Sequence, residues 1–152
     1  QQNLSLSPED TAYLLDRYHL PQPRIALGKA LAEHVTCAMD ISDGLLADLQ
    51  HICRASGVGA TIESTNIPLS AATHRALEND NTLLHTILTG GDDYELLFAV
   101  PPSCADVIET LQDVTDTSIR AIGMINDTPE LRVLDAQGNT LTFDTLGYAH
   151  FK

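Results

Sequence analysis

The stretch VTCAMDISDGL, residues 35–45, joins a short apolar run to a segment with helical periodicity. The run at 35–39 has the length and composition of a buried strand. Beyond it, the apolar residues follow the spacing of one helix face: Leu45, Leu46, Leu49, Ile52 and Cys53. Gly57 is a suitable C-terminal stop for that helix. Residues 40–44 are therefore predicted to form a strand-to-helix turn that carries two carboxylates and a hydroxyl.

The rest of the chain supplies further helices and strands around this turn. Helical patterns cover 8–20, 24–34, 71–77, 82–88 and 103–111, the last with Ser103 as its expected cap. Strand patterns cover 60–63, 94–100 and 118–125, and a closing hairpin is expected over 131–134 and 140–143. The core order strand, helix, strand, strand, helix, strand is the split βαβ pattern. The predicted fold class is α+β, with a split βαβ-type mixed sheet covered by helices.

Composition limits the class of protein. The 152 residues are 43% hydrophobic, enough for one globular domain with its own core. No apolar stretch approaches the roughly 20 residues of a membrane span, and no signal sequence is visible. The three cysteines, Cys37, Cys53 and Cys104, form neither a disulfide framework nor a metal motif, which favours a cytoplasmic location.

The charge is strongly negative, with 8 Lys and Arg against 21 Asp and Glu and a net charge of −13. This charge argues against binding to nucleic acid or to an anionic membrane. If the protein holds a phosphorylated ligand, its few basic residues cannot neutralise the phosphates. Divalent cations held by carboxylates would then take that role.

The first acidic turn, MDISDGL at 39–45, offers a candidate metal site. Asp40 ends an apolar run, where an unpaired carboxylate would be costly, so Mg²⁺ is a sensible partner for it. Ser42 and Asp43 stand at a helix start and could be ordinary caps instead. Asp48, one turn into the helix, could add another oxygen ligand, but a solvated helix residue is the favoured interpretation.

The second acidic turn, Gly90-Gly91-Asp92-Asp93, precedes the strand expected at 94–100. Two adjacent acids at a strand start should point apart, so that one faces a ligand and the other braces the turn. A capped tight turn without a ligand is the alternative.

Taken together, the motifs resemble the C-terminal half of the thiamine-monophosphate kinase family. They are PQPRIALG, AMDISDGLLADLQHICRASGVGATIE, IPLS, LTGGDDYELLFAVPP, IRAIGMI and GYAHF, in that order. The resemblance extends from Arg24 to the end of the chain. It implies the fold of the C-terminal domain in the superfamily of aminoimidazole ribonucleotide synthetase and selenophosphate synthetase.

The resemblance also implies a reaction and the residues that serve it. The family transfers the γ-phosphoryl group of ATP directly onto thiamine monophosphate, with Mg²⁺ between the anions and no phosphoenzyme. By position, Asp40 and Asp43 match Mg²⁺ ligands, and Ser42 matches an ATP contact. Asp92 matches a thiamine-phosphate contact, and Tyr148 in GYAHF matches an aromatic residue beside the substrate ring, where relatives often have Trp or Phe.

Domain organisation follows from the same resemblance. Residues 1–152 are expected to be a single C-terminal domain of a longer chain, with a leading helix and linker at 1–23 and the core and substrate-contacting tail at 24–152. The N-terminal ATP-binding domain would be absent, so the fragment alone is expected to be inactive. The full-length protein is expected to be a homodimer.

Two alternatives remain open at this point. One is another ATP-dependent kinase or synthetase of the same superfamily that acts on a different small molecule. The other is a non-catalytic acidic module that binds cations or a partner protein, with the two acidic turns serving only as structural caps.

Overall fold

The computed structural model describes residues 6–147 of the chain. Its helices are α1 Pro8–His19, α2 Ile25–Leu31, α3 Leu45–Ser56, α4 Ala71–Asn79, α5 Leu83–Thr89 and α6 Ala105–Thr115, with short 3-10 turns η1 Ser64–Asn66 and η2 Pro102–Cys104. Its strands are β1 Cys37–Asp40, β2 Gly59–Glu63, β3 Leu96–Ala99, β4 Gly123–Asn126 and β5 Leu131–Leu134. Along the described helices, none is long and apolar enough to cross a membrane.

The strands of the described chain form two sheets. β1 and β3 pair as an antiparallel ribbon, from Cys37 opposite Ala99 to Asp40 opposite Leu96. In the second sheet β2 is central, antiparallel to β4 and parallel to β5. The α+β class with a mixed sheet is confirmed, and the core elements follow one another in the predicted order. Their pairing is divided between two sheets rather than gathered in one.

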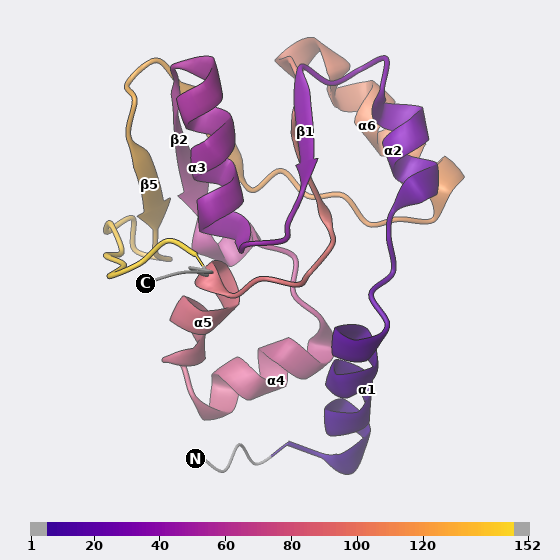
Figure 1. Cartoon of the computed structure of the whole chain (residues 1–152), viewed down its shortest axis with the longest axis vertical. Helices are drawn as coiled ribbons and strands as arrows, with labels where there is room; N and C mark the ends of the chain where they lie inside the picture. Colours follow the sequence, from indigo (N-terminus) through magenta and orange to yellow (C-terminus); the bar gives the residue numbers. More distant parts are fainter. Residues whose placement is uncertain (1–5, 148–152) are drawn as a thin grey trace.

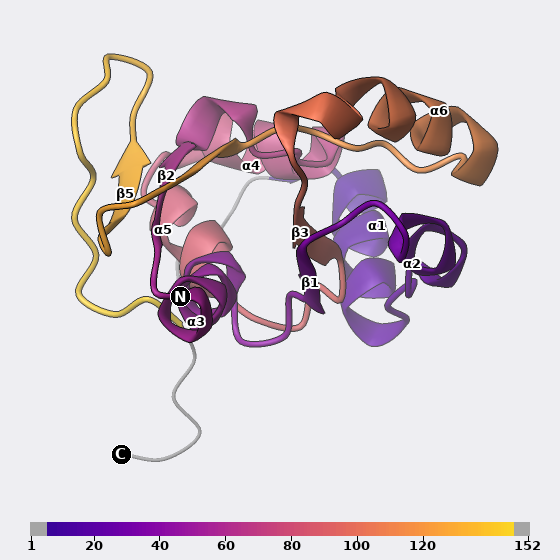
Figure 2. The ribbon, with the colours of Figure 1, turned by 90° about the horizontal axis from the view of Figure 1, so that it is seen from above.

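Helix α3 connects the two sheets. It contacts both β1 and β2 and lies between them in both views (Figures 1 and 2). The predicted apolar stripe is buried except for Ile52, which is half-buried, and Gly57 ends the helix in the left-handed conformation with φ of 67°. The core around α3 contains Leu45, Leu46, Leu49, Cys53, Ala60, Ile62, Leu88, Leu97 and Val133. Because this core fixes the first turn of α3, it also fixes the acidic turn that precedes the helix.

The remaining helices lie around these sheets. Helices α2 and α6 contact each other, as do α1 and α4. Ser7 caps α1, because its Oγ accepts a hydrogen bond from the Asp10 backbone N–H at 3.0 Å. Asp10 is buried and forms an ion pair with Arg75 of α4, with 2.8 Å between Arg75 Nε and Asp10 Oδ2.

Three local expectations were wrong. The strand expected at 118–125 begins only at Gly123, and the Ile119 N–H donates to the side chain of Gln112 on α6. The hairpin is reduced to β5 and one bridge from Leu134 to Thr140. The helix expected to be capped by Ser103 begins after a 3-10 turn, and its N-cap is Cys104 without a side-chain hydrogen bond.

Candidate functional site

The first acidic turn lies between β1 and α3, as predicted. Asp40 ends β1 and is exposed, whereas Ser42 and Asp43 are half-buried. The expectation that Asp40 needs a cation because of burial was therefore wrong, because water reaches its carboxylate in the described chain. Its accessibility instead leaves it available to a ligand.

Helix α3 begins without a side-chain cap. Its N-cap is Gly44, with φ of 112°, rather than Ser42 or Asp43. A Cβ at Gly44 would lie 2.7 Å from the Thr89 carbonyl oxygen and 2.8 Å from that of Gly90. Glycine at this position therefore serves both the backbone conformation and the close approach of the second acidic turn.

Asp48 reaches back from α3 to the turn. It is 1% exposed, and its Oδ2 accepts hydrogen bonds from the backbone N–H groups of Ser42 at 2.9 Å and Asp43 at 3.1 Å. The expectation that Asp48 is a solvated helix residue was wrong. Its spacing from Leu45 and Ile52, three and four residues away, places it on the apolar face, and this was the signal in the sequence.

The second acidic turn lies directly beside the first. The Asp92 N–H donates to the Ser42 carbonyl at 3.0 Å, and the Tyr94 N–H donates to the Ile41 carbonyl at 2.8 Å. A Cβ at Gly91 would lie 2.2 Å from the Ser42 carbonyl oxygen. The two motifs that the sequence singled out therefore lie together, and Gly91, like Gly44, permits their close approach.

The backbone of the second turn is unusual for residues with side chains. Asp92 has φ of 70° and Tyr94 has φ of 52°, both in the left-handed region. The Tyr94 hydroxyl donates a hydrogen bond to Asp92 Oδ1 at 3.1 Å. The strand expected from 94 consequently begins at Leu96, and the alternation expected for Asp92 and Asp93 at a strand start does not apply.

The pKa of Asp93 reflects the negative charge gathered at the site. Desolvation by the surrounding protein, followed by the charges of Glu95, Asp92 and Asp48, raises its pKa to about 6. The side chain as a whole is exposed, so its carboxyl is crowded by neighbours rather than sealed from water. Such concentrated negative charge favours a bound cation.

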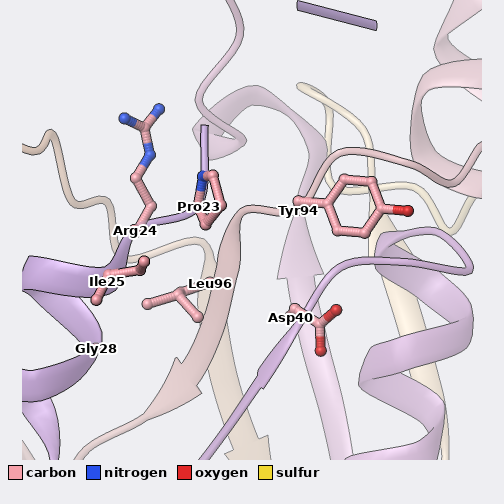
Figure 3. A pocket seen from close by; sticks show the side chains of 7 residues that line it. All are labelled: Pro23, Arg24, Ile25, Gly28, Asp40, Tyr94 and Leu96. Carbon is pink, nitrogen blue, oxygen red and sulfur yellow. The ribbon is translucent and has the colours of Figure 1, made fainter. Parts of the chain in front are cut away.

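An apolar pocket of about 270 Å³ adjoins the acidic turns. In Figure 3, Asp40 and Tyr94 stand on one side of it and Pro23, Arg24 and Ile25 on the other, with Leu96 between them. Arg24 also forms a bidentate ion pair with Glu95, which Figure 3 does not label. The distances are 2.8 Å from Arg24 Nε to Glu95 Oε2 and 2.6 Å from Arg24 Nη2 to Glu95 Oε1. Because Glu95 lies between the second turn and β3, this ion pair ties the start of α2 to the site.

The residues present are suited to Mg²⁺ but do not form a complete cage. Within residues 6–147, no three His, Cys, Asp or Glu side chains gather closely enough to hold a metal ion. Asp40 and Asp43 nevertheless offer hard oxygen donors on one turn. Mg²⁺ commonly binds one or two carboxylates and completes its shell with water and substrate phosphates. The donor set therefore fits an ion shared with a phosphorylated ligand.

Tyr148 lies outside the described residues. The described chain ends at Gly147, where a Cβ would lie 2.3 Å from Ala47 Cβ and 2.8 Å from the Asp43 carbonyl oxygen. The segment before Tyr148 therefore lies against the first acidic turn. Sequence reasoning missed the roles of Asp48, Tyr94 and Arg24, although all three belong to motifs it had singled out.

The fold agrees with a comparison to known protein families. The family described as AIR synthase related protein, C-terminal domain, matches residues 5–136. This match covers most of the chain, and the chain belongs to that family.

Sequence comparison finds thiamine-monophosphate kinases among the relatives of this chain. The thiamine-monophosphate kinase of Salmonella typhimurium is 38% identical over 152 residues, covering 99% of this chain and 46% of that protein. The resemblance that the motifs indicated is thus confirmed. The chain spans less than half the length of this curated relative.

Solved structures support the same comparison. Thiamine-monophosphate kinase from Stenotrophomonas maltophilia is 35% identical, with a TM-score of 0.78 over 85% of this chain and 41% of that chain. AaThiL in complex with AMPPCP and TMP is 28% identical, with a TM-score of 0.77 over 97% of this chain and 44% of that chain.

Proposed function

We propose that this chain is the C-terminal half of an enzyme that transfers the γ-phosphoryl group of ATP to thiamine monophosphate, giving thiamine diphosphate. The observation that carries the proposal is the hydrogen bond from Asp92 N to Ser42 O at 3.0 Å, which joins the two acidic turns into one site. The similarity to thiamine-monophosphate kinases supports the same reaction, as does a neighbour that binds AMPPCP and TMP.

In this proposal, the first acidic turn serves the nucleotide. Asp40 and Asp43 are Mg²⁺ ligands, and Ser42 contacts ATP. Mg²⁺, when bound, neutralises the charge of two phosphorylated substrates, which a domain of net charge −13 cannot do with its own cations. The hydrogen bond between Asp92 and Ser42 supports a phosphoryl donor that binds beside its acceptor.

The second acidic turn and the tail serve the acceptor. Asp92 contacts thiamine monophosphate, and Tyr148 stacks against its ring. The position of Gly147 beside Asp43 supports this role, because the chain reaches the site immediately before Tyr148. Phosphoryl transfer of this kind depends mainly on positioning and charge neutralisation, so no protein nucleophile is required.

The same proposal assigns the rest of the machinery to a longer protein. An N-terminal domain would contribute the adenine pocket and further Mg²⁺ ligands, and the full-length protein would pair as a homodimer. The donor set of the described residues supports this division, because Asp40 and Asp43 leave coordination positions for other ligands. The 152-residue chain alone is expected to be inactive.

The direct test is product formation by the full-length protein with ATP, Mg²⁺ and thiamine monophosphate, followed by chromatography of thiamine diphosphate. Product is expected from the full-length protein and not from the 152-residue chain. Phosphorylation of a different small molecule in a substrate screen, with thiamine monophosphate left unreacted, would refute the proposed substrate.

A further inference from the structure

Asp48 is a buried carboxylate outside the set of residues proposed to touch metal or substrate. It lies on the first turn of α3 and is 1% exposed. Its Oδ2 accepts hydrogen bonds from two backbone N–H groups, those of Ser42 and Asp43. Hydrogen bonds to an ionised acceptor are about twice as strong as neutral ones. This carboxylate therefore holds the turn at two consecutive peptide units.

Those two peptide units also hold the second acidic turn. The Ser42 N–H belongs to the same peptide plane as the Ile41 carbonyl, and the Asp43 N–H to the same plane as the Ser42 carbonyl. Cis peptides are absent from the described chain, so each N–H points opposite to its carbonyl. The Ile41 carbonyl accepts from Tyr94 N–H, and the Ser42 carbonyl accepts from Asp92 N–H.

We propose that Asp48 is a positioning residue that orients these two peptide planes and thereby holds both acidic turns in register. One side of each plane binds Asp48 and the opposite side binds the segment 92–94. If the planes rotate, Asp92 and Tyr94 lose their backbone acceptors together. Asp48 thus influences the second acidic turn, which is proposed to contact thiamine monophosphate, without touching the substrate itself. Its effect on catalysis rests on the proposed function.

The experiment compares variants of the full-length enzyme. Asp48→Ala removes the acceptor oxygen, whereas Asp48→Asn retains an oxygen that accepts both bonds in neutral form. Asp106→Asn is the matched control, because Asp106 is also in the first turn of a helix, α6, but is exposed. Leu31→Ala, at a fully buried position of α2 outside the core around α3, is a control for lost stability alone.

Two measurements are made below the unfolding temperature of every variant. Amide hydrogen exchange follows residues 41–45 and 92–95, and steady-state kinetics give the KM for thiamine monophosphate and the Mg²⁺ concentration at half activity. Asp48→Ala is expected to speed exchange in both segments at once and to raise both kinetic constants by about tenfold. Asp48→Asn should bring the exchange rates and both kinetic constants most of the way back to the wild-type values. Both control variants should resemble the wild type in exchange and in kinetics.

Faster exchange confined to 41–45, or kinetic losses fully explained by the unfolded fraction of Asp48→Ala, would overturn the positioning role. If Asp48→Ala does not fold, Asp48→Asn decides: intermediate exchange in both segments supports the role, and unchanged exchange at 92–95 refutes it. Exchange is measured without substrate. Failure of the proposed function, seen as wild-type inactivity on thiamine monophosphate, is therefore a separate result.

Discussion

Asp92 and Ser42, from turns far apart in the sequence, are joined by a backbone hydrogen bond of 3.0 Å. The bond continues the pairing of β1 with β3 beyond Asp40 and Leu96, where the strands end. One acidic turn thus follows the last residue of β1 and the other precedes the first residue of β3, so the two turns face one another beyond the paired strands.

Gly91 is predicted to be intolerant of any side chain. In Gly91→Ala the new Cβ would lie 2.2 Å from the Ser42 carbonyl oxygen, so the turns must separate. We expect at least a tenfold loss in kcat/KM for thiamine monophosphate, about 1.4 kcal/mol in transition-state stabilisation. The assay is steady-state kinetics of the full-length enzyme.

Gly57→Ala is the control for this substitution. Gly57 also has a constrained backbone, with φ of 67°, but a Cβ there meets nothing within 4 Å. It should lower stability by about 1 kcal/mol through backbone strain and leave kcat/KM unchanged. Equal kinetic effects of the two substitutions would contradict the importance of the contact between the turns.

Asp40→Asn is predicted to separate catalysis from stability. Because Asp40 is exposed, its loss should change the free energy of unfolding by no more than about 0.5 kcal/mol. Loss of this proposed metal ligand should lower kcat at least a hundredfold and raise the Mg²⁺ requirement. Thermal unfolding and a Mg²⁺ titration of activity measure the two effects, with Asp113→Asn on α6 as the exposed control.

Asp43→Asn should show the same separation, since Asp43 is proposed to hold Mg²⁺ from the same turn. A fall in unfolding temperature that matches the fall in activity would instead favour a purely structural turn. That result, in either variant, would argue for the non-catalytic alternative.

Asp93 is predicted to make stability depend on pH. Its pKa is about 6 in the folded chain and near 3.8 when unfolded, so the folded state binds the extra proton between these values. Its contribution to stability is full below pH 4 and is lost as the pH rises through 6. Asp93→Asn should therefore gain stability relative to the wild type between pH 4 and pH 7.

The gain should be about 1 kcal/mol, less than the pKa shift alone implies, because the side chain is partly solvated and its charges are screened. Thermal unfolding in buffers without divalent cations measures it, with Asp113→Asn as control. The same difference between wild type and variant at pH 4 and pH 7 would show that Asp93 titrates normally.

The ion pair between Asp10 and Arg75 is predicted to stabilise the attachment of α1 without affecting the site. Asp10 is buried, and the hydrogen bond from Arg75 holds its pKa below the usual value. The stabilisation is present above pH 3.8 and is lost as the pH falls through the lowered pKa. Arg75→Ala should lower the unfolding temperature by roughly 5 °C at pH 7, because it leaves a buried carboxylate unpaired.

Kinetic constants of Arg75→Ala, measured below that temperature, should match the wild type. Asp10→Asn combined with Arg75→Ala should recover part of the loss. A double variant that is less stable than Arg75→Ala would contradict this account of the pair.

Local patterns predicted the elements that position the site. The strand-to-helix turn at 40–44 was confirmed, because an apolar run and a helical stripe meet there and nothing distant alters either. The second turn was located correctly, but its backbone was not. Asp92 and Tyr94 adopt left-handed conformations because their N–H groups bond to Ser42 and Ile41, and pairing between distant segments leaves no local signal.

The burial of two aspartates in the site was also predicted wrongly. Asp40 was expected to be buried and Asp48 exposed, and the structure reverses both. Residue type favours exposure for any aspartate, but Asp48 lies on the apolar face of α3 and meets two N–H donors there. Asp40 lies on the face of β1 shared with Ala38, which is also exposed. Helix periodicity was the better guide to burial than residue type.

The pairing of the two turns determines when the site can form during synthesis of the chain. The backbone hydrogen bonds within α3 join residues close in sequence, but the bond from Asp92 to Ser42 exists only once β1 has closed against β3 across the intervening segment. Pairings of such long sequence separation form slowly. A nascent chain that has exposed DISDGL but not yet residues 92–99 would therefore carry the first acidic turn without the second, and the proposed ligand site would form only when β1 and β3 have paired.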